Sequence, residues 1–266
     1  MPTPRISASS YSNTAPLIWS FLYGSNRGRF ELILDNAPAR SAELLAQKRT
    51  CAALVPVIEY QRIEDVLLVA DVCVGAKQTV RSVCLVTKGE KLETVKSVAL
   101  DVSSRTSVAL TKIIFSEFLQ REPNYKAAEP NLEQMLAHSD CALLIGDPAL
   151  TIDEKIYRKF DLAETWKEFT GFGFVFAMWM ANAEKAKTAK QINFQSAREE
   201  GLQHLDEIIA NYETEISLAP GDFKKYLSEN IAYTIDDSMR AGLSLYFELA
   251  NKHNLIERLK PLRFLD

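Results

Sequence analysis

The chain has 266 residues, of which 47% are apolar and 25% are charged, and a globular protein of this composition can bury a substantial core. Lys and Arg total 31 against 35 Asp and Glu, a formal net charge of -4, and no basic run is long enough to attract nucleic acid. No run of about 18 apolar residues could span a membrane, so we expect a soluble cytoplasmic protein.

The N-terminal part of the chain alternates apolar runs with amphipathic segments. Strands are predicted at residues 4–9, 30–35 and 51–57, with helices at 15–23 and 37–49 between them. This order predicts a parallel sheet with right-handed crossovers. The continuous apolar run at 51–57 is typical of a strand that is buried on both faces. Residues 66–86 hold two or three further strands with no room for helices, which favours antiparallel additions.

A second α/β unit follows the first. Its predicted elements are a strand at 97–102, a helix at 103–119, a strand at 141–147 and a strand at 172–181. From residue 195 the pattern is helical, with a break at Pro220 and Gly221 and further helices at 222–230 and 236–253.

These units predict an α/β protein with two lobes, a central cleft and C-terminal helices. We expect lobe I to hold residues 1–86 and 184–266, and lobe II to hold residues 87–183. Two crossing strands, near 83–88 and 176–183, would join them, and the C-terminal helices would pack on lobe I. The cleft is the natural ligand site, because loops at the carboxyl ends of parallel strands line such a crevice.

Cysteine and histidine spacing gives no sign of a disulfide or a metal site. The four cysteines are far apart in apolar runs, so they are predicted to be reduced and buried: Cys51, Cys73, Cys84 and Cys141. None of the histidines has a second histidine or a cysteine at ligand spacing: His138, His204 and His253.

The first strand-to-helix junction, "SASSYSNTAPLIW", is rich in hydroxyl and amide side chains. Asn13 and Thr14 precede Pro16, which is the order of a helix cap followed by proline in the first turn. A cap accounts for one of these side chains and leaves Ser10 and its serine neighbours unexplained, so a ligand role stays open.

The second junction, "LDVSSRTSVAL", follows an apolar strand and begins a helix. Free backbone N–H groups, the helix dipole and several hydroxyls make this turn a good receptor for a carboxylate. Its polar residues are Ser103, Ser104, Arg105, Thr106 and Ser107.

Two further junctions carry polar residues. In "LIGDPAL", Gly146 and Asp147 end a strand, and Asp147 could cap a helix, bind a ligand hydroxyl or act as a base. In "TVRSVCLV", Arg81 could pair with a carboxylate through both guanidinium nitrogens or lie in solvent, and Ser82 follows it.

Six segments at these junctions, in order over roughly residues 4–181, resemble the chorismate dehydratase family of the futalosine route to menaquinone. They are "SNTAPLIW", "AELLAQKRTCAALVPVIEY", "VRSVCLV", "LDVSSRTSVALTKII", "LLIGDPAL" and "DLAETWKEFTGFGFVFAMW". The resemblance implies a fold similar to type 2 periplasmic binding proteins. It also implies a hydro-lyase that converts chorismate to 3-[(1-carboxyvinyl)oxy]benzoate without metal or organic cofactor.

The resemblance also implies a role for Asn13, which would orient the substrate and stabilise the departing hydroxyl or the developing charge. We predict Ser82 as a second catalytic residue. The predicted substrate-binding residues are Ser10, Thr14, Arg81, Ser104, Arg105, Thr106, Ser107, Gly146 and Asp147. In this hypothesis the turn at 104–107 holds one carboxylate and Ser82 contacts the second.

The base would be the substrate's enolpyruvyl carboxylate or Asp147, because an amide is not a competent base near neutral pH. Two alternatives stay open: a binding or sensor protein for a small carboxylate, and the sister enzyme 1,4-dihydroxy-6-naphthoate synthase.

Overall fold

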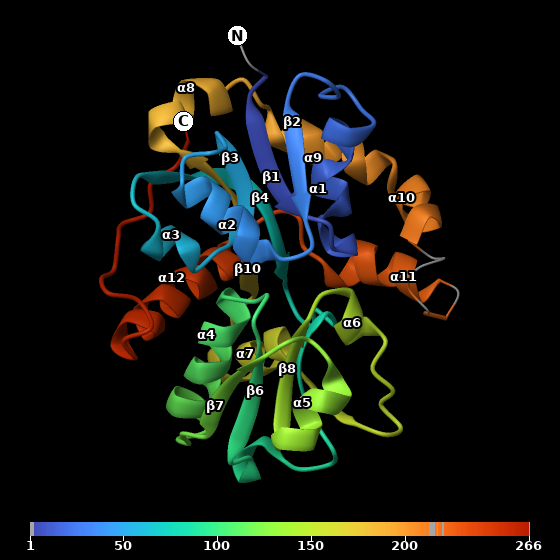
Figure 1. The fold of residues 1–266 in the computed structure, drawn as a ribbon, viewed down its shortest axis with the longest axis vertical. Coiled ribbons are helices and arrows are strands. Elements are labelled where there is room, and N and C mark those ends of the chain that lie inside the picture. The colour runs from blue at the N-terminus through green and yellow to red at the C-terminus, as the bar shows by residue number, and fades with distance from the viewer. Residues whose placement is uncertain (1–2, 213–215, 217, 220, 266) are drawn as a thin grey trace.

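The computed structural model describes residues 3–212, 216, 218–219 and 221–265, and within them the strands form two separate five-stranded sheets. One sheet has the order β2-β1-β3-β10-β4 and the other the order β7-β6-β8-β5-β9. Figure 1 shows one sheet above the other, each with its own helices. The predicted α/β class with two lobes is confirmed.

The lobe I sheet begins with the predicted parallel βαβαβ unit. Its strands and helices are β1 (Arg5–Ser9), α1 (Ala15–Leu22), β2 (Glu31–Asp35), α2 (Pro38–Ala46), β3 (Ala52–Pro56), α3 (Glu59–Arg62), β4 (Val66–Ala76) and β10 (Phe174–Asn182). β1 pairs in parallel with β2 and β3, whereas β10 runs antiparallel between β3 and β4. β3 is buried along its whole length, as its apolar run predicts.

In the lobe II sheet β6 lies between β7 and β8 and runs parallel to both, and β8 is the central strand. Its elements are β5 (Val83–Thr87), β6 (Ser97–Asp101), α4 (Thr106–Ile113), the π-helix η3 (Ile114–Phe118), β7 (Asn124–Ala128), α5 (Leu132–His138), β8 (Cys141–Ile145), α6 (Asp147–Leu150), β9 (Arg158–Asp161) and α7 (Leu162–Thr170). β7 was not predicted from the sequence, because this edge strand buries none of its residues fully and therefore lacks an apolar pattern.

The chain crosses between the sheets at residues 77–82 and 171–173, which corrects the predicted crossing strands. β5 pairs along its whole length with β8 in lobe II, and β10 pairs with β3 and β4 in lobe I. Strands 83–88 and 176–183 therefore do not cross, residues 83–86 belong to lobe II, and 174–182 belong to lobe I. An apolar strand satisfies its backbone groups by pairing within one sheet, which leaves the crossings to short turns.

The C-terminal segments lie against lobe I and across the waist of the molecule (Figure 1). They are α8 (Ala186–Ala189), α9 (Phe194–Gln203), α10 (Leu205–Tyr212), α11 (Asp222–Lys225), the π-helix η5 (Tyr226–Asn230) and α12 (Asp237–Lys252). α9 packs on α1 in lobe I, but α12 contacts both β10 and α4. The prediction of packing on lobe I is thus incomplete, since an amphipathic pattern marks a buried face but not its partner. Pro220 lies outside the described residues.

Two further sequence expectations concern side-chain burial and helix length. All four cysteines are buried and free of disulfide bonds. In the part of the chain that the structure describes, every helix is too short or too polar to cross a membrane.

Candidate active site

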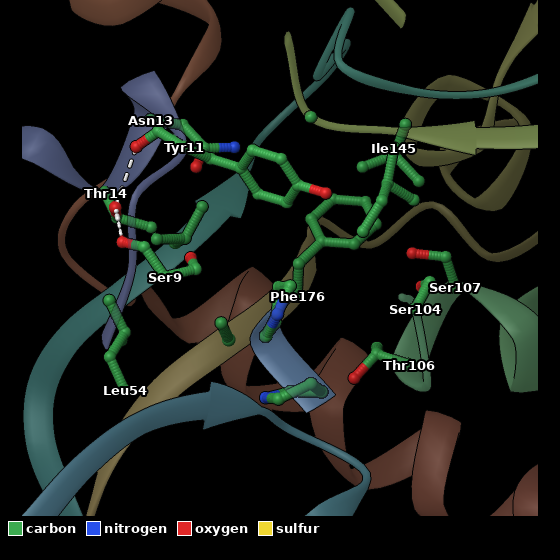
Figure 2. Close-up of a pocket in the computed structure, with 16 residues that line it drawn as sticks. Ser9, Tyr11, Asn13, Thr14, Leu54, Ser104, Thr106, Ser107, Ile145 and Phe176 are labelled. Atoms are coloured by element: carbon green, nitrogen blue, oxygen red, sulfur yellow. Dashed lines mark hydrogen bonds between the residues drawn. The ribbon is translucent and has the colours of Figure 1, made fainter. Parts of the chain in front are cut away.

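A cavity lies between the two lobes, near the carboxyl end of β1 (Figure 2). Lobe I lines it with Ser9, Tyr11, Asn13, Thr14, Pro38, Leu54, Pro56, Val74, Phe176 and Ala177, and lobe II with Val83, Ser104, Thr106, Ser107, Ile145 and Gly146. Its volume is about 60 Å³, which is room for a few water molecules. A ligand with a six-membered ring therefore needs the lobes to separate or a lining side chain to move.

The first junction divides its polar side chains between the turn and the cavity. The Thr14 hydroxyl donates to the carbonyl oxygens of Ser9 at 2.7 Å and Tyr11 at 2.8 Å, so it stabilises the turn η1 (Ser12–Thr14) before α1. Ser10 donates to Asn36 Oδ1 at 3.1 Å and does not line the cavity. Asn13, only 8% exposed, is the amide that lines it.

The second junction supplies the opposite wall. Ser104, Thr106 and Ser107 line the cavity where α4 begins, and the N-cap residue of this helix, Arg105, makes no capping hydrogen bond with its side chain. Figure 2 shows these three residues grouped across the cavity from Asn13. Uncapped N–H groups beside hydroxyls are suited to a carboxylate, so the structure brings together this part of the predicted set.

Arg105 is not a cavity residue, in contrast to its neighbours. Its guanidinium donates to Glu59 Oε2 at 2.9 Å and to Glu43 Oε1 at 3.4 Å. Glu59 begins α3 and Glu43 lies in α2, so Arg105 of lobe II pairs with two carboxylates of lobe I. The guanidinium is thus engaged between the lobes in this structure, and the binding of a substrate carboxylate by Arg105 stays a prediction.

Three further predicted site residues border the cavity without lining it. The Arg81 guanidinium lies 3.8 Å from the Asp222 carboxylate at α11, and Ser82 is fully buried in the crossing segment. Asp147 accepts hydrogen bonds from the N–H of Ser12, at 3.2 and 3.3 Å, and from the Ser12 hydroxyl. Asp147 therefore joins lobe II to lobe I, and its roles as a cap, a ligand for a substrate hydroxyl or a base stay predictions.

Tyr11 and Asp101 are site residues that the sequence did not single out. The Tyr11 hydroxyl lies 3.5 Å from Ser103 Oγ, and Ser103 donates to Asp101 Oδ1 from its hydroxyl at 2.6 Å and its N–H at 2.8 Å. Burial raises the pKa of Tyr11 and that of Asp101. An aromatic residue inside the polar run at 7–14 was a signal, but its reach into lobe II was not readable from sequence.

Gly146 provides the surface on which the Tyr11 ring lies. A Cβ atom at position 146 would come within 2.7 Å of that ring, and the backbone φ is +70°, a conformation that favours glycine. Glycine at this position lets the loop before α1 approach the end of β8.

The described residues contain no group of three or more His, Cys, Asp or Glu side chains arranged to hold a metal ion.

A family model described as menaquinone biosynthesis matches residues 4–252. This chain belongs to the menaquinone biosynthesis family. The match confirms the resemblance drawn from the six sequence segments, and it includes both walls of the cavity.

Solved structures of other proteins show the same fold as this member of the menaquinone biosynthesis family. Protein AF1704 from Archaeoglobus fulgidus has a TM-score of 0.74 at 15% identity, covering 95% of this chain and 98% of that one. A Candida albicans gene product described as having the generic periplasmic binding protein fold has a TM-score of 0.67 at 11% identity, and the match covers 98% of this chain and 92% of that one. The periplasmic aliphatic sulphonate binding protein SsuA from Escherichia coli has a TM-score of 0.63 at 15% identity, and the match covers 99% of this chain and 94% of that one. The periplasmic-binding-protein-like fold is therefore shown.

Proposed function

We propose that this member of the menaquinone biosynthesis family is a cytoplasmic chorismate dehydratase, which converts chorismate to 3-[(1-carboxyvinyl)oxy]benzoate and water. One observation carries the proposal: the cavity between the lobes sets the Asn13 amide opposite the hydroxyls and free N–H groups at the start of α4. Chorismate has a matching form, with a ring hydroxyl, a flat ring and two carboxylates.

The walls of the cavity fit a ring better than an extended polar chain. Leu54, Ile145 and Phe176 offer apolar contacts between its two polar ends. In the proposed complex, one carboxylate binds Ser104, Thr106 and Ser107 at the positive end of the α4 dipole. Asn13 then hydrogen-bonds the ring hydroxyl, so the leaving group and the carboxylate are fixed at opposite ends.

The base comes from the substrate in this proposal. The described side chains that line the cavity include no carboxylate, imidazole or amine, and Asp147 is bound to Ser12. The enolpyruvyl carboxylate of chorismate is close to the ring proton beside the departing hydroxyl, and it can take that proton within the bound molecule. Formation of the aromatic ring drives the elimination, so the protein contributes chiefly by orienting the reacting groups and by electrostatic stabilisation.

The test is incubation of the purified protein with chorismate, followed by the change in ultraviolet absorbance as the diene becomes an aromatic ring. We expect turnover by the wild type and a loss of about 100-fold or more in kcat for Asn13→Ala, the range seen for one preorganised hydrogen-bond donor. Asn251→Ala is the matched control, because Asn251 is exposed on α12, outside the cavity, and its variant should keep full activity.

Other outcomes would replace the proposal. Chorismate binding without any spectral change would favour a carboxylate-binding or sensor protein. If the protein neither binds nor converts chorismate, the result would favour the sister enzyme, 1,4-dihydroxy-6-naphthoate synthase. Full turnover by Asn13→Ala would remove Asn13 from the mechanism.

A further inference from the structure

The elimination needs an acid as well as a base, and this inference rests on the proposed chorismate dehydratase activity. The departing group is a hydroxyl, and hydroxide is a poor leaving group because the pKa of water is about 15.7. Asn13 can donate a hydrogen bond to that oxygen but keeps its proton. Another group must convert the hydroxyl to water as the C–O bond breaks.

The cavity offers one side chain with suitable acidity. Among the described residues that line the cavity, only Tyr11 has a side chain that can lose a proton in aqueous solution, with an ordinary pKa of roughly 10. The others carry aliphatic hydroxyls, the Asn13 amide or apolar groups. Burial raises the pKa of Tyr11, and the nearby charges of Asp101 and Asp147 add to this, so Tyr11 is protonated at neutral pH.

The position of Tyr11 also fits the task. Figure 2 shows its ring extending from the Asn13 side of the cavity towards Ile145, above the ring of Phe176. The ring lies on Gly146, which a Cβ atom would prevent. Its hydroxyl makes one long contact, 3.5 Å, to Ser103. Such contacts are often long before the substrate binds, and the phenolic proton can turn towards a ligand.

We propose that Tyr11 is the general acid of the dehydration, donating its phenolic proton to the departing ring hydroxyl. The C–O bond breaks as the Tyr11 O–H bond breaks, and the proton and the hydroxyl leave as water. The ring proton passes to the enolpyruvyl carboxylate, and the electron pair of that C–H bond forms the new ring double bond. The resulting carboxylic acid then returns a proton to the Tyr11 phenolate, so the cycle closes without a co-reactant.

Ser103 and Asp101 act through Tyr11 as positioning residues. Asp101 is fully buried at the end of β6, and both the hydroxyl and the N–H of Ser103 donate to its Oδ1 atom. These bonds fix the Ser103 hydroxyl beside that of Tyr11, and because the Ser103 proton is used in the bond to Asp101, the Tyr11 hydroxyl is the donor in their 3.5 Å contact. Ser103, Asp101 and Gly146 belong to lobe II while Tyr11 belongs to lobe I, so the acid is aligned only when the lobes are closed.

The first experiment compares Tyr11→Phe with the wild type on chorismate. General acid catalysis contributes about 10²- to 10⁴-fold, so we expect kcat to fall by that range while KM stays within about threefold. Tyr23→Phe is the matched control, because Tyr23 is 60% exposed outside the cavity and should keep full activity. Unchanged kcat in Tyr11→Phe, with the wild type active, would overturn the inference.

The second experiment tests whether the Tyr11 proton itself is used. The wild-type rate should be lost at high pH as Tyr11 ionises, and 3,5-difluorotyrosine at position 11, a more acidic phenol, should move that loss to lower pH. Asp101→Asn should move it the same way, because the charge of Asp101 raises the pKa of Tyr11.

Packing roles for these residues predict a different pattern. If the wild type, the protein with 3,5-difluorotyrosine at position 11 and Asp101→Asn all have the same pH profile, Tyr11 and Asp101 serve packing alone and the inference is overturned. A wild type that binds chorismate without consuming it would reject the dehydratase itself, and with it the acid.

Discussion

The ion pair between Arg105 and Glu59 joins the lobes, and we predict that Arg105→Gln destabilises the closed protein without removing a substrate contact. Arg105 Nη1 lies 2.9 Å from Glu59 Oε2, and the Glu59 side chain is only 3% exposed. Without Arg105, this buried carboxylate keeps one partner, Arg62, at 2.9 Å from its other oxygen.

The expected magnitude follows from the burial of the pair. Exposed ion pairs contribute about 0–1 kcal/mol, whereas removal of one partner from a buried pair costs about 3–5 kcal/mol. Arg105 is 30% exposed and Arg62 remains in place, so we expect a loss of about 1–3 kcal/mol in the free energy of unfolding. The contact with Glu43, at 3.4 Å and 42% exposed, should add less than about 0.5 kcal/mol.

The assay is a double-mutant cycle in urea with Arg105→Gln, Glu59→Gln and the double variant, and Glu43→Gln as the control. We expect a coupling energy of at least about 1 kcal/mol between Arg105 and Glu59. A coupling below about 0.5 kcal/mol would refute the argument from burial. A large rise in KM for chorismate in Arg105→Gln, with unchanged stability, would instead restore Arg105 as the carboxylate ligand that its sequence position suggested.

Two further predictions concern Gly146 and Glu117. Gly146→Ala should cost about 1–3 kcal/mol of stability from backbone strain, and it should also lower turnover by displacing the Tyr11 ring. Gly28 has a φ of +75° and no atom near the position of a Cβ, so Gly28→Ala should cost stability alone. Equal turnover in the two variants would contradict this prediction. Hydrogen bonds from Lys252, and to a lesser extent from His253, hold the pKa of Glu117 below its usual value. Glu117 therefore stabilises the folded protein at a pH above its pKa in the unfolded chain, and this stabilisation is lost as the pH falls through its pKa in the folded protein. In thermal unfolding, Glu117→Gln should therefore cost under about 1 kcal/mol at pH 7 and nothing once the pH is below the folded pKa of Glu117. A cost that persists in acid would show another origin.

Much of the fold could be predicted from local patterns. The parallel βαβαβ unit follows from apolar runs of strand length separated by amphipathic helices, and β3 is buried as its run of apolar residues requires. The crossings were misplaced because β5 and β10 are as apolar as any strand within a sheet. An apolar sequence pattern indicates that a strand is buried, but it does not indicate which of the two sheets contains that strand.

The candidate site divides in the same way. Asn13, Ser104 and Ser107 lie at strand-to-helix junctions, and the rule that such junctions face the cleft was enough to find them. Arg105 is adjacent in sequence to Ser104 but extends to Glu59 instead, a partner 46 residues away. Local chemistry cannot reveal such a partner, because a charged side chain pairs with whatever the fold brings near it.

The sequence alone determined the α/β class, the two lobes and the polar turns that form the cavity, because these depend on periodicity and on residue types at short spacing. Only the tertiary structure decided which polar groups face a ligand and which join the lobes. Asp147 with Ser12, Arg105 with Glu59, and Tyr11 with Ser103 are all contacts between lobe I and lobe II. Each depends on how two separately folded sheets approach one another, and their relative position follows from the packing of the whole chain.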